Sequence, residues 1–403
     1  MRLSTQSYYS RSINAMLEQQ SALSRIQTQV ATGRKINSPA DDPIASVHIM
    51  ELERSKAEYA QFEKNSSLAR NRLNLEESSM ADAGTVLQRV RELVLQASNI
   101  GTLNANDRAS IATELASRLE QMQDIANRKD GNGEYLFSGF STLTQPFAGA
   151  SSGNVVYAGD QGARLLQVGP TQRIADSHSG FDVFMKIPEG NGTFVTGVGA
   201  TNTGSGSINV GSVTNPNAWI PDDYTLTFTN ATTWEITDSA TPTPNVVATG
   251  TYTSGSAIAF NGVQVVIKGE PAVGDTFSIG QSYNEDVFKT INDIVEVLRS
   301  PAGDPAGNAK MSSSLERSLQ QIDQASDHLI GVRAQIGSRL SALDTADSAR
   351  EDLNIDLDTA LSDLRDLDYA EALARMNQQL VGLQAAQMSY SQISQLSLFN
   401  YLK

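Results

Sequence analysis

Apolar residues recur at alternating steps of three and four along much of the chain, which is the spacing of a helix that packs on other helices. One such run covers residues 52–94 and predicts a coiled-coil-like helix of about 50 residues. A turn at residues 101–106 follows, and a second run at 111–125 ends before Gly131. Because the turn is short, we expect these two helices to form an antiparallel hairpin.

The same periodicity returns in the last third of the chain. Residues 287–298 form a short amphipathic run that ends at Ser300-Pro301, since a residue before proline disfavours the helical conformation. Residues 315–364 then keep one three-four register. The register fails at residues 365–368 and restarts in a new phase, which predicts a domain boundary or a swivel there.

The two ends of the chain carry separate apolar stripes, which we interpret as assembly surfaces. The N-terminal stripe is Ile13, Leu17, Leu23, Ile26 and Val30, and the C-terminal stripe is Leu373, Met376, Leu380, Leu383, Tyr390, Ile393, Leu396 and Phe399. Ordering about 30 residues costs about 1 to 2 kcal/mol each, whereas burying about five apolar side chains returns about 1.5 to 3 kcal/mol each. We therefore predict that both terminal segments are mobile in the free monomer and become ordered on assembly.

A connector follows the first helix, in the segment ATGRKINSPADDPIAS at residues 31–46. Glycine can end a helix, and asparagine and proline prevent an early restart. An aspartate can then cap the next helix, with proline at its favoured first-turn position. The connector residues are Gly33, Asn37, Pro39, Asp41, Asp42 and Pro43, where either aspartate is a possible cap.

Helical periodicity gives way to Gly, Thr, Ser and Asn between residues 134 and 283. Residues 224–229, 234–237, 257–260 and 263–267 alternate as β-strands do. Asn261-Gly262, between the last two, is a strong two-residue hairpin signal. Residues 190–220 carry little apolar mass, so we expect part of this stretch to be loop.

These patterns predict a mainly α fold with a β insert, in which a long helical bundle is built from both chain ends. We expect residues 1–43 and 366–403 to form an assembly domain with its connector. Residues 44–133 and 284–365 would form the helical bundle, and residues 134–283 the inserted β domain. All 12 prolines lie between Pro39 and Pro305, which fits helical arms around a non-helical insert.

Composition narrows the classes of function. A net charge of -15, from 30 Lys and Arg against 45 Asp and Glu, argues against a nucleic-acid-binding protein. The absence of cysteine excludes disulfides and cysteine nucleophiles. The first thirty residues lack the apolar core of a secretory signal peptide, and no apolar run approaches the ~18 residues that span a bilayer. Cytoplasmic residence and export without a cleaved signal both fit these features.

Candidate catalytic and metal-binding residues are few, and we expect neither a cofactor nor a metal. His48, His178 and His328 lie in three different regions without a nucleophile motif beside them. Asp130 to Glu134 resembles the start of a calcium loop but lacks its later glycine and acid. Gly269 and Gly274 have phosphate-loop spacing, but an aspartate stands where the lysine would be. A strand-connecting turn is the better interpretation of those glycines.

The two end segments resemble the signatures of the bacterial flagellin family. The segment ATGRKINSPADDPIAS is similar to the N-terminal signature, and RDLDYAEALARMNQQLVGLQAAQMSYSQISQLSLFNYLK to the C-terminal one. Two internal motifs, KDGNGEYLFSGF from Lys129 and EPAVGDTF from Glu270, resemble the branch of the family that joins hook and filament. The ending Phe399-Asn-Tyr-Leu-Lys403 departs from the Leu-Leu-Arg type expected of a filament flagellin.

The resemblance implies a structural protein without catalysis. It implies that the terminal helices line the inner core of a tube, with the β insert facing outward. Expected partners are further copies in a homo-oligomeric ring, hook-associated protein 1, flagellin and a flagellar export chaperone, with no nucleic acid and no membrane insertion. The location would be the extracellular flagellum, reached unfolded through the flagellar type III apparatus.

Two alternatives stay open at the level of sequence. The chain could be a minor flagellin that builds the filament itself. From a different class of function, residues 134–283 could be a carbohydrate-binding or hydrolytic module carried on a flagellin-like scaffold. No carboxylate spacing in the insert points to a glycosidase.

Overall fold

The structure, a computed structural model, describes residues 5–99, 103–149, 155–240, 242–300 and 303–395. The chain divides into two compact units. Unit 1 comprises residues 1–64 and 345–403, and unit 2 comprises residues 65–344. The two units meet within α2 and α5, whereas the three domains expected from the sequence have their boundaries near helix ends. The three-domain division stays a prediction.

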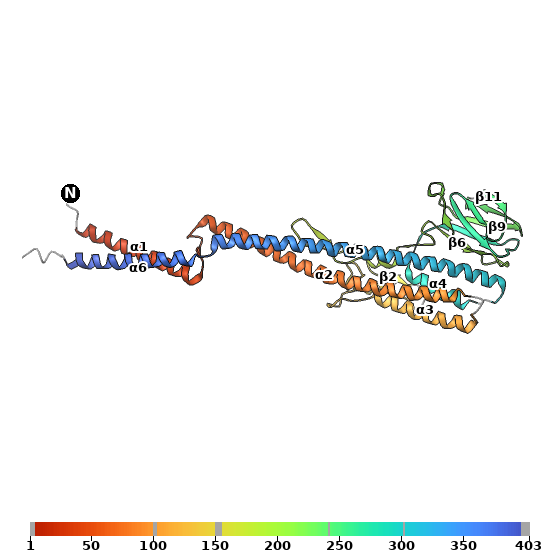
Figure 1. The fold of residues 1–403 in the computed structure, drawn as a ribbon, viewed down its shortest axis with the longest axis horizontal. Coiled ribbons are helices and arrows are strands. Elements are labelled where there is room, and N and C mark those ends of the chain that lie inside the picture. Colours follow the sequence, from red (N-terminus) through yellow and green to blue (C-terminus); the bar gives the residue numbers. More distant parts are fainter. Residues whose placement is uncertain (1–4, 100–102, 150–154, 241, 301–302, 396–403) are drawn as a thin grey trace, which may run out of the picture. The chain divides into compact units, whose positions relative to one another are not determined.

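Unit 1 is made of helices (Figure 1). It contains α1 (Thr5–Thr32), α6 (Tyr369–Gln395), the first part of α2 (Pro43–Ala97) and the last part of α5 (Pro305–Arg365). Within it α2 and α5 run antiparallel, since Lys56 pairs with Asp358 and Glu53 with Arg365. The predicted long helix of about 50 residues is confirmed by the 55 residues of α2. The predicted break in register is also confirmed, because α5 ends at Arg365 and α6 begins at Tyr369.

The helices of unit 2 form a bundle with a continuous apolar core. The remaining parts of α2 and α5 pack there with α3 (Ala105–Ala126) and α4 (Val287–Arg299). Ion pairs join Arg89 to Glu114 at 2.8 Å and Asp82 to Arg128 at 2.7 Å. Their order along the two helices confirms the predicted antiparallel hairpin of α2 and α3. Asn104 caps α3, and α4 ends at Arg299 with Ser300 as its C-cap, where the residue pattern predicted the stop.

Short irregular elements follow α3 and pack against the bundle. They are β1 (Phe147–Ala148), β2 (Val156–Tyr157), β3 (Leu165–Gln167), β4 (Arg173–Ala175), the π-helix η2 (Phe181–Met185) and β5 (Ile187–Pro188), which pairs with β15 (Asn284–Glu285). Their core is aromatic. Phe147 packs edge-to-face on Phe184, with ring centroids 5.5 Å apart, and at a tilt on Phe288 of α4, with centroids 5.1 Å apart.

The insert consists of two antiparallel sheets around one core. Five strands lie in the order β11-β10-β9-β14-β6: β6 (Phe194–Val198), β9 (Tyr224–Asn230), β10 (Thr233–Thr237), β11 (Val246–Thr251) and β14 (Thr276–Gln281). The smaller sheet contains β12 (Ala257–Phe260) and β13 (Val263–Lys268), with β7 (Ser207–Ile208) and β8 (Ser212–Val213) beside β13. A 3-10 turn, η3 (Pro216–Ala218), follows β8.

The four predicted strands of the insert are confirmed, and so is the hairpin. Asn261 and Gly262 have φ of 41° and 75°, the left-handed values that a two-residue hairpin turn requires. The prediction that part of residues 190–220 is loop is confirmed, and the short strands β6, β7 and β8 lie in the same stretch. Phe194 and Thr196 of β6 are buried by pairing with β14, a long-range contact that local periodicity does not reveal.

Candidate assembly surface

The two terminal helices pair with each other in antiparallel fashion, side by side in Figure 1. A Cβ added at Gly382 of α6 would meet the side-chain amide of Gln19 on α1. At the other end of the pair, Gly33 lies against the hydroxyl of Tyr369. Residue number rises on one helix as it falls on the other, which fixes the antiparallel direction. The absence of side chains at the two glycines lets the helices approach closely.

Some side chains of the two stripes predicted from the sequence are covered within the helix pair, and others are exposed to solvent. Leu23 is buried, and Ile26, Val30, Met376, Leu380, Leu383 and Tyr390 are half-buried. By contrast, Ile13, Leu17 and Leu373 are 40%, 57% and 42% exposed. Ile393 lies in the last turn of α6, and Leu396 and Phe399 lie outside the described residues. In the described part of each stripe, the neighbouring helix therefore covers some of the apolar side chains and leaves others exposed.

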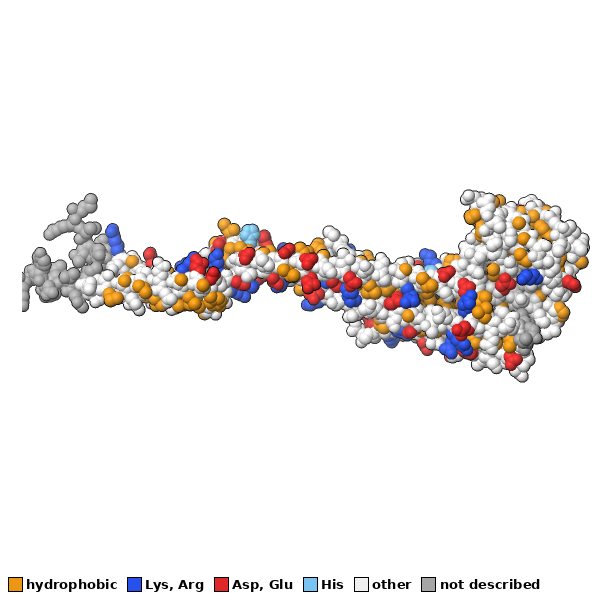
Figure 2. Space-filling model, viewed as in Figure 1, with side chains coloured by type: hydrophobic (Ala, Val, Ile, Leu, Met, Phe, Trp, Pro, Cys, Tyr) orange, Lys and Arg blue, Asp and Glu red, His pale blue; other side chains and the backbone are white. Residues whose placement is uncertain are grey.

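A second apolar stripe, which the sequence reasoning missed, runs beside the first on α6. Val381 and Met388 are 66% and 64% exposed, and seven residues place them on one side of the helix. Val381 is about 100° around the helix from the half-buried Leu380. Figure 2 shows hydrophobic side chains gathered along the surface of the α1 and α6 pair. The run Leu380-Val381 and the uncharged residues 377–395 could have revealed this stripe from the sequence.

Unit 1 buries little apolar surface of its own. Among the described residues its buried apolar side chains are Leu23, Phe62, Leu361 and Ala372. Its exposed large ones are far more numerous and extend beyond the terminal helices: Ile13, Leu17, Ile44, Val47, Met50, Leu353, Ile355, Tyr369, Leu373, Val381 and Met388. A surface of this kind is typical of a subunit that completes its packing with other subunits.

The connector between α1 and α2 is ordered by its two aspartates. Asp41 accepts hydrogen bonds at Oδ2 from the backbone N–H groups of Asn37, at 3.1 Å, and Ser38, at 2.9 Å. Asp42 accepts at Oδ1 from the N–H groups of residues 44 and 45, and Pro43 begins α2. Of the two caps left open by the sequence, Asp42 therefore caps α2, while Asp41 holds the turn before it. Pro39 lies within that turn.

The connector pairs with the break between α5 and α6. We call these two paired segments the joint. The N–H of Lys35 donates to the carbonyl oxygen of Arg365 at 2.7 Å, and the N–H of Leu367 donates to that of Gly33 at 3.0 Å. Arg34 and Asp366 lie opposite each other between these bonds. Gly33 has a φ of 70°, which permits the turn out of α1 at no steric cost. The α1–α2 connector and the α5–α6 break thus form one short antiparallel ribbon.

Carboxylates surround the joint. A cavity of about 520 Å³ beside it is lined by Asp41, Asp42, Asp363, Asp366, Asp368 and Glu371, together with Arg25, Lys35 and Arg375. Hydrogen bonds from the backbone N–H groups of Ser38 and Asn37 lower the pKa of Asp41 below its ordinary value. Hydrogen bonds from the side chains of Ser362 and Arg365 lower the pKa of Asp366 below its ordinary value. Both groups therefore stay ionised at neutral pH.

The histidines singled out by sequence are held by packing partners. His48 lies exposed on α2 beside Glu51. His328 lies 2.7 Å from the carbonyl oxygen of Asp182, and the Nδ1 atom of His178 lies 2.8 Å from Glu76. In the part of the chain that the structure describes, no cluster of three or more His, Asp or Glu residues is placed to hold a metal.

The two acidic motifs also have structural partners. Asp275, in the turn with phosphate-loop spacing, is buried and accepts hydrogen bonds from the backbone N–H groups of Thr203, Gly204 and Ala272. Asp130, in the calcium-loop-like segment, pairs with Arg72. A strand-connecting turn therefore describes the first motif well.

Arg72 is the centre of a buried ionic cluster that sequence reasoning missed. Its guanidinium lies 2.9 Å from Asp130, 3.0 Å from Glu134 and 3.4 Å from Asp176. Asp176 is fully buried and also pairs with Arg164 at 2.6 Å. This cluster joins the turn after α3 and the segment before η2 to α2. Ion pairs between residues so distant in sequence leave no local periodic signal.

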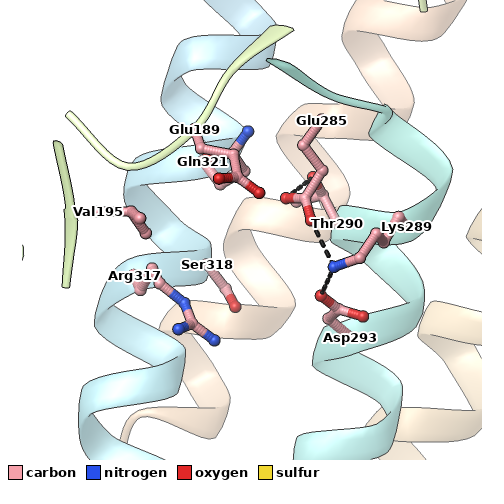
Figure 3. Close-up of a pocket in the computed structure, with 9 residues that line it drawn as sticks. All are labelled: Glu189, Val195, Glu285, Lys289, Thr290, Asp293, Arg317, Ser318 and Gln321. Carbon is pink, nitrogen blue, oxygen red and sulfur yellow. Dashed lines mark hydrogen bonds and ion pairs between the residues drawn. The ribbon is translucent and has the colours of Figure 1, made fainter. Parts of the chain in front are cut away.

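A cavity of about 220 Å³ lies among α4, α5 and β6 (Figure 3). The ammonium of Lys289 lies between Glu285, at 2.5 Å, and Asp293, at 2.6 Å. Glu189 also lines the cavity, where burial and the nearby Glu285 raise its pKa. From α5, the amide of Gln321 accepts from the N–H of Gly190 at 2.9 Å and donates to the carbonyl of Pro188 at 3.2 Å. These contacts fasten the start of the insert to α5.

Comparisons with known proteins agree with this architecture. Residues 3–142 match the bacterial flagellin N-terminal helical region, residues 319–402 match the C-terminal helical region, and residues 198–281 match the D2-like domain of flagellar hook-associated protein 1. The chain is 24% identical to flagellar hook-associated protein 3 of Salmonella typhimurium over 99% of both chains.

Solved structures decide the family. The FlgL crystal structure of Xanthomonas campestris is 40% identical, with a TM-score of 0.72 over 77% of this chain and 99% of that one. The flagellar junction protein FlgL of Legionella pneumophila is 36% identical, with a TM-score of 0.71 over 79% and 100%. The chain belongs to the flagellar hook-associated protein 3 family.

Membership in the hook-associated protein 3 family makes the chain a structural component of the bacterial flagellum, which serves motility. The mainly α fold with a β insert predicted from the sequence is confirmed. Its association with other flagellar components follows from the same relationship. Among its described helices, none combines the length and the apolar character needed to cross a membrane.

Proposed function

We propose that this chain forms the junction ring between the flagellar hook and filament. Copies would assemble on hook-associated protein 1 and present a flagellin-like surface to the first filament subunits. The observation that carries the proposal is the imbalance in unit 1, whose described part exposes far more large apolar side chains than it buries. The family relationship supports the same assignment, because one relative is described as a flagellar junction protein.

In this proposal the terminal helices are the assembly surface. The inward stripe, with the buried Leu23 on α1 and the half-buried Leu380 on α6, holds the two helices together. The exposed stripe, with Val381 and Met388, packs against neighbouring copies. Burying one such side chain contributes about 1.5 to 3 kcal/mol. Two helices with so little internal core become fully ordered only on assembly.

Export is part of the same proposal. The chain would leave the cell unfolded through the flagellar type III apparatus, escorted by an export chaperone, and would act outside the cell. Few buried contacts hold unit 1 together, which favours this route because a marginal structure is easily kept unfolded. In the assembled flagellum the terminal helices would line the inner tube and the β insert would face outward.

The second candidate is a minor flagellin, which the matches to both flagellin end regions favour. Deletion of the gene separates the two. A junction protein predicts complete hooks without filaments and monomeric flagellin shed into the medium. Filaments of normal length on the hooks would refute the junction role.

A further inference from the structure

The loop that follows Phe137 presents two large apolar side chains to solvent in unit 2. Phe140 is 65% exposed and Leu143 is 82% exposed. The three residues before Gly139 are buried, at 1% exposure for Leu136 and none for Phe137 and Ser138. The motif KDGNGEYLFSGF therefore consists of a buried anchor and an exposed tip. We call Phe140 and Leu143 the loop tip.

The loop tip is held in place. Asp160 accepts hydrogen bonds from the backbone N–H of Phe140 at 3.0 Å and from the hydroxyl of Ser141 at 3.1 Å. Gly139 has a φ of 66°, and the ring of Phe140 covers Gly162, where an added Cβ would meet it. The hydrogen bond from the N–H of Phe140 is also the main cause that lowers the pKa of Asp160. An aromatic side chain on so fixed a loop loses little conformational entropy on binding.

The surroundings of the loop tip indicate the kind of partner. Residues 135–159 contain no charged side chain, whereas the whole chain has a net charge of -15. Like charges keep copies of an acidic protein apart over most of its surface. The segment of residues 135–159 adds no like charge to a contact between two copies, and the carboxylate of Asp160 beside it is bonded to the backbone of Phe140.

We propose that the loop tip is a contact between neighbouring copies of this chain, additional to the surface of unit 1. Phe140 is the anchor that contacts the neighbour, Leu143 widens the apolar contact, and Asp160 is a positioning residue that holds the backbone N–H of Phe140. This contact between copies requires assembly, but it does not depend on whether the copies form a ring or a filament.

Photo-crosslinking in intact flagella tests the contact. Because the chain has no cysteine, Thr144→Cys introduces a single thiol beside the loop tip that can carry benzophenone maleimide and leaves Phe140 in place. We expect illumination to give a covalent dimer of the chain. Val273→Cys is the matched control, since Val273 is 68% exposed on the insert, and it should give no dimer. A crosslink from position 144 to a different flagellar protein, or no crosslink at all, would overturn the proposal.

Two further variants separate the contact from a folding defect. Phe140→Ser and Asp160→Ala should each lower the self-association constant of the purified full chain about tenfold or more, as loss of an interface hot spot does. The circular dichroism spectrum of both variants should stay unchanged. Unchanged association in Phe140→Ser would contradict the contact. A dimer found along the filament would keep the contact and refute only the junction ring.

Discussion

Leu367 donates its backbone N–H to the carbonyl oxygen of Gly33 at 3.0 Å, which brings the α5–α6 break onto the α1–α2 connector. Together with the bond from Lys35 to Arg365, it makes Arg34 and Asp366 a non-hydrogen-bonded antiparallel pair. The Cα atoms of such pairs lie about 4.5 Å apart, within the range that a disulfide spans. The α1–α2 connector and the α5–α6 break are therefore paired with each other by backbone hydrogen bonds.

This pairing predicts a disulfide in the variant Arg34→Cys/Asp366→Cys. Mild oxidation should convert the purified chain to a form with altered mobility in a denaturing gel, and a reductant should reverse the change. Each single variant should show no such intramolecular form, because the chain has no other cysteine. Failure of the double variant to close would mean that the two segments of the joint do not pair in solution.

The aspartates of the connector predict a specific response to acid. The pKa of Asp41 lies below its ordinary value of 3.8, so its stabilising contribution is present above pH 3.8 and is lost as pH falls through its folded pKa. The amide resonances of Asn37 and Ser38 should therefore titrate together with a midpoint below pH 3.8. A midpoint at or above 3.8 would show that Asp41 does not hold this turn.

Asp42 has a different role from Asp41, since it caps α2, and a substitution can test that role separately. Asp42→Ala removes the N-cap of α2 and should destabilise the start of that helix by about 1 kcal/mol. Faster hydrogen exchange confined to the first turns of α2 would show it. Asp42→Asn is the matched control, because an asparagine caps nearly as well and should leave exchange close to that of the unchanged chain.

The buried cluster predicts a large loss of stability in unit 2. Arg72→Met should lower the free energy of unfolding by about 3 to 5 kcal/mol, since it leaves Asp130 and Glu134 without their main partner. Urea unfolding followed by circular dichroism measures this. Arg89→Met is the control, because the pair of Arg89 with Glu114 is exposed and should contribute less than about 1 kcal/mol. An equal decrease in the free energy of unfolding in the two variants would show that the buried cluster does not stabilise unit 2 more than an exposed ion pair does.

The attachment of the insert to α5 can be tested at Gln321. Gln321→Leu keeps the side-chain volume but leaves the N–H of Gly190 and the carbonyl of Pro188 without their partner, at about 1 to 3 kcal/mol for each buried group. Residues 188–194 should then exchange amide hydrogen faster and be cut sooner by protease. Gln320→Leu, one position earlier on the same helix, serves as the control. Unchanged protection in Gln321→Leu would show that the amide does not fasten the insert.

The sequence revealed those parts of the fold that depend on local periodicity. The seam at residues 315–364 and its failure at residues 365–368 located α5 and the α5–α6 break. The sequence could not show that the α5–α6 break pairs with Gly33, or that Arg72 pairs with Asp130 and Asp176. Both contacts join residues far apart in the chain, and neither leaves a local pattern. On α6, Leu380 and Val381 are both apolar, so periodicity alone could not tell which faces α1 and which faces outward.

That distinction gives a paired prediction for assembly. Val381→Asp should leave the α1 and α6 pair intact but abolish incorporation into the junction, because a charge in a buried subunit contact is costly unless it is paired. Leu380→Asp should abolish incorporation as well, by separating α6 from α1. Both should leave the bundle of unit 2 folded. Normal junctions in Val381→Asp would show that the exposed stripe is not a contact between subunits.

The most direct test of the central claim is an electron cryomicroscopy map of the intact junction. We predict one closed layer of this chain between hook-associated protein 1 and flagellin, with Leu373, Val381 and Met388 buried between neighbouring copies. Density for the chain repeated along the filament, or a closed layer in which these three side chains face water, would contradict it.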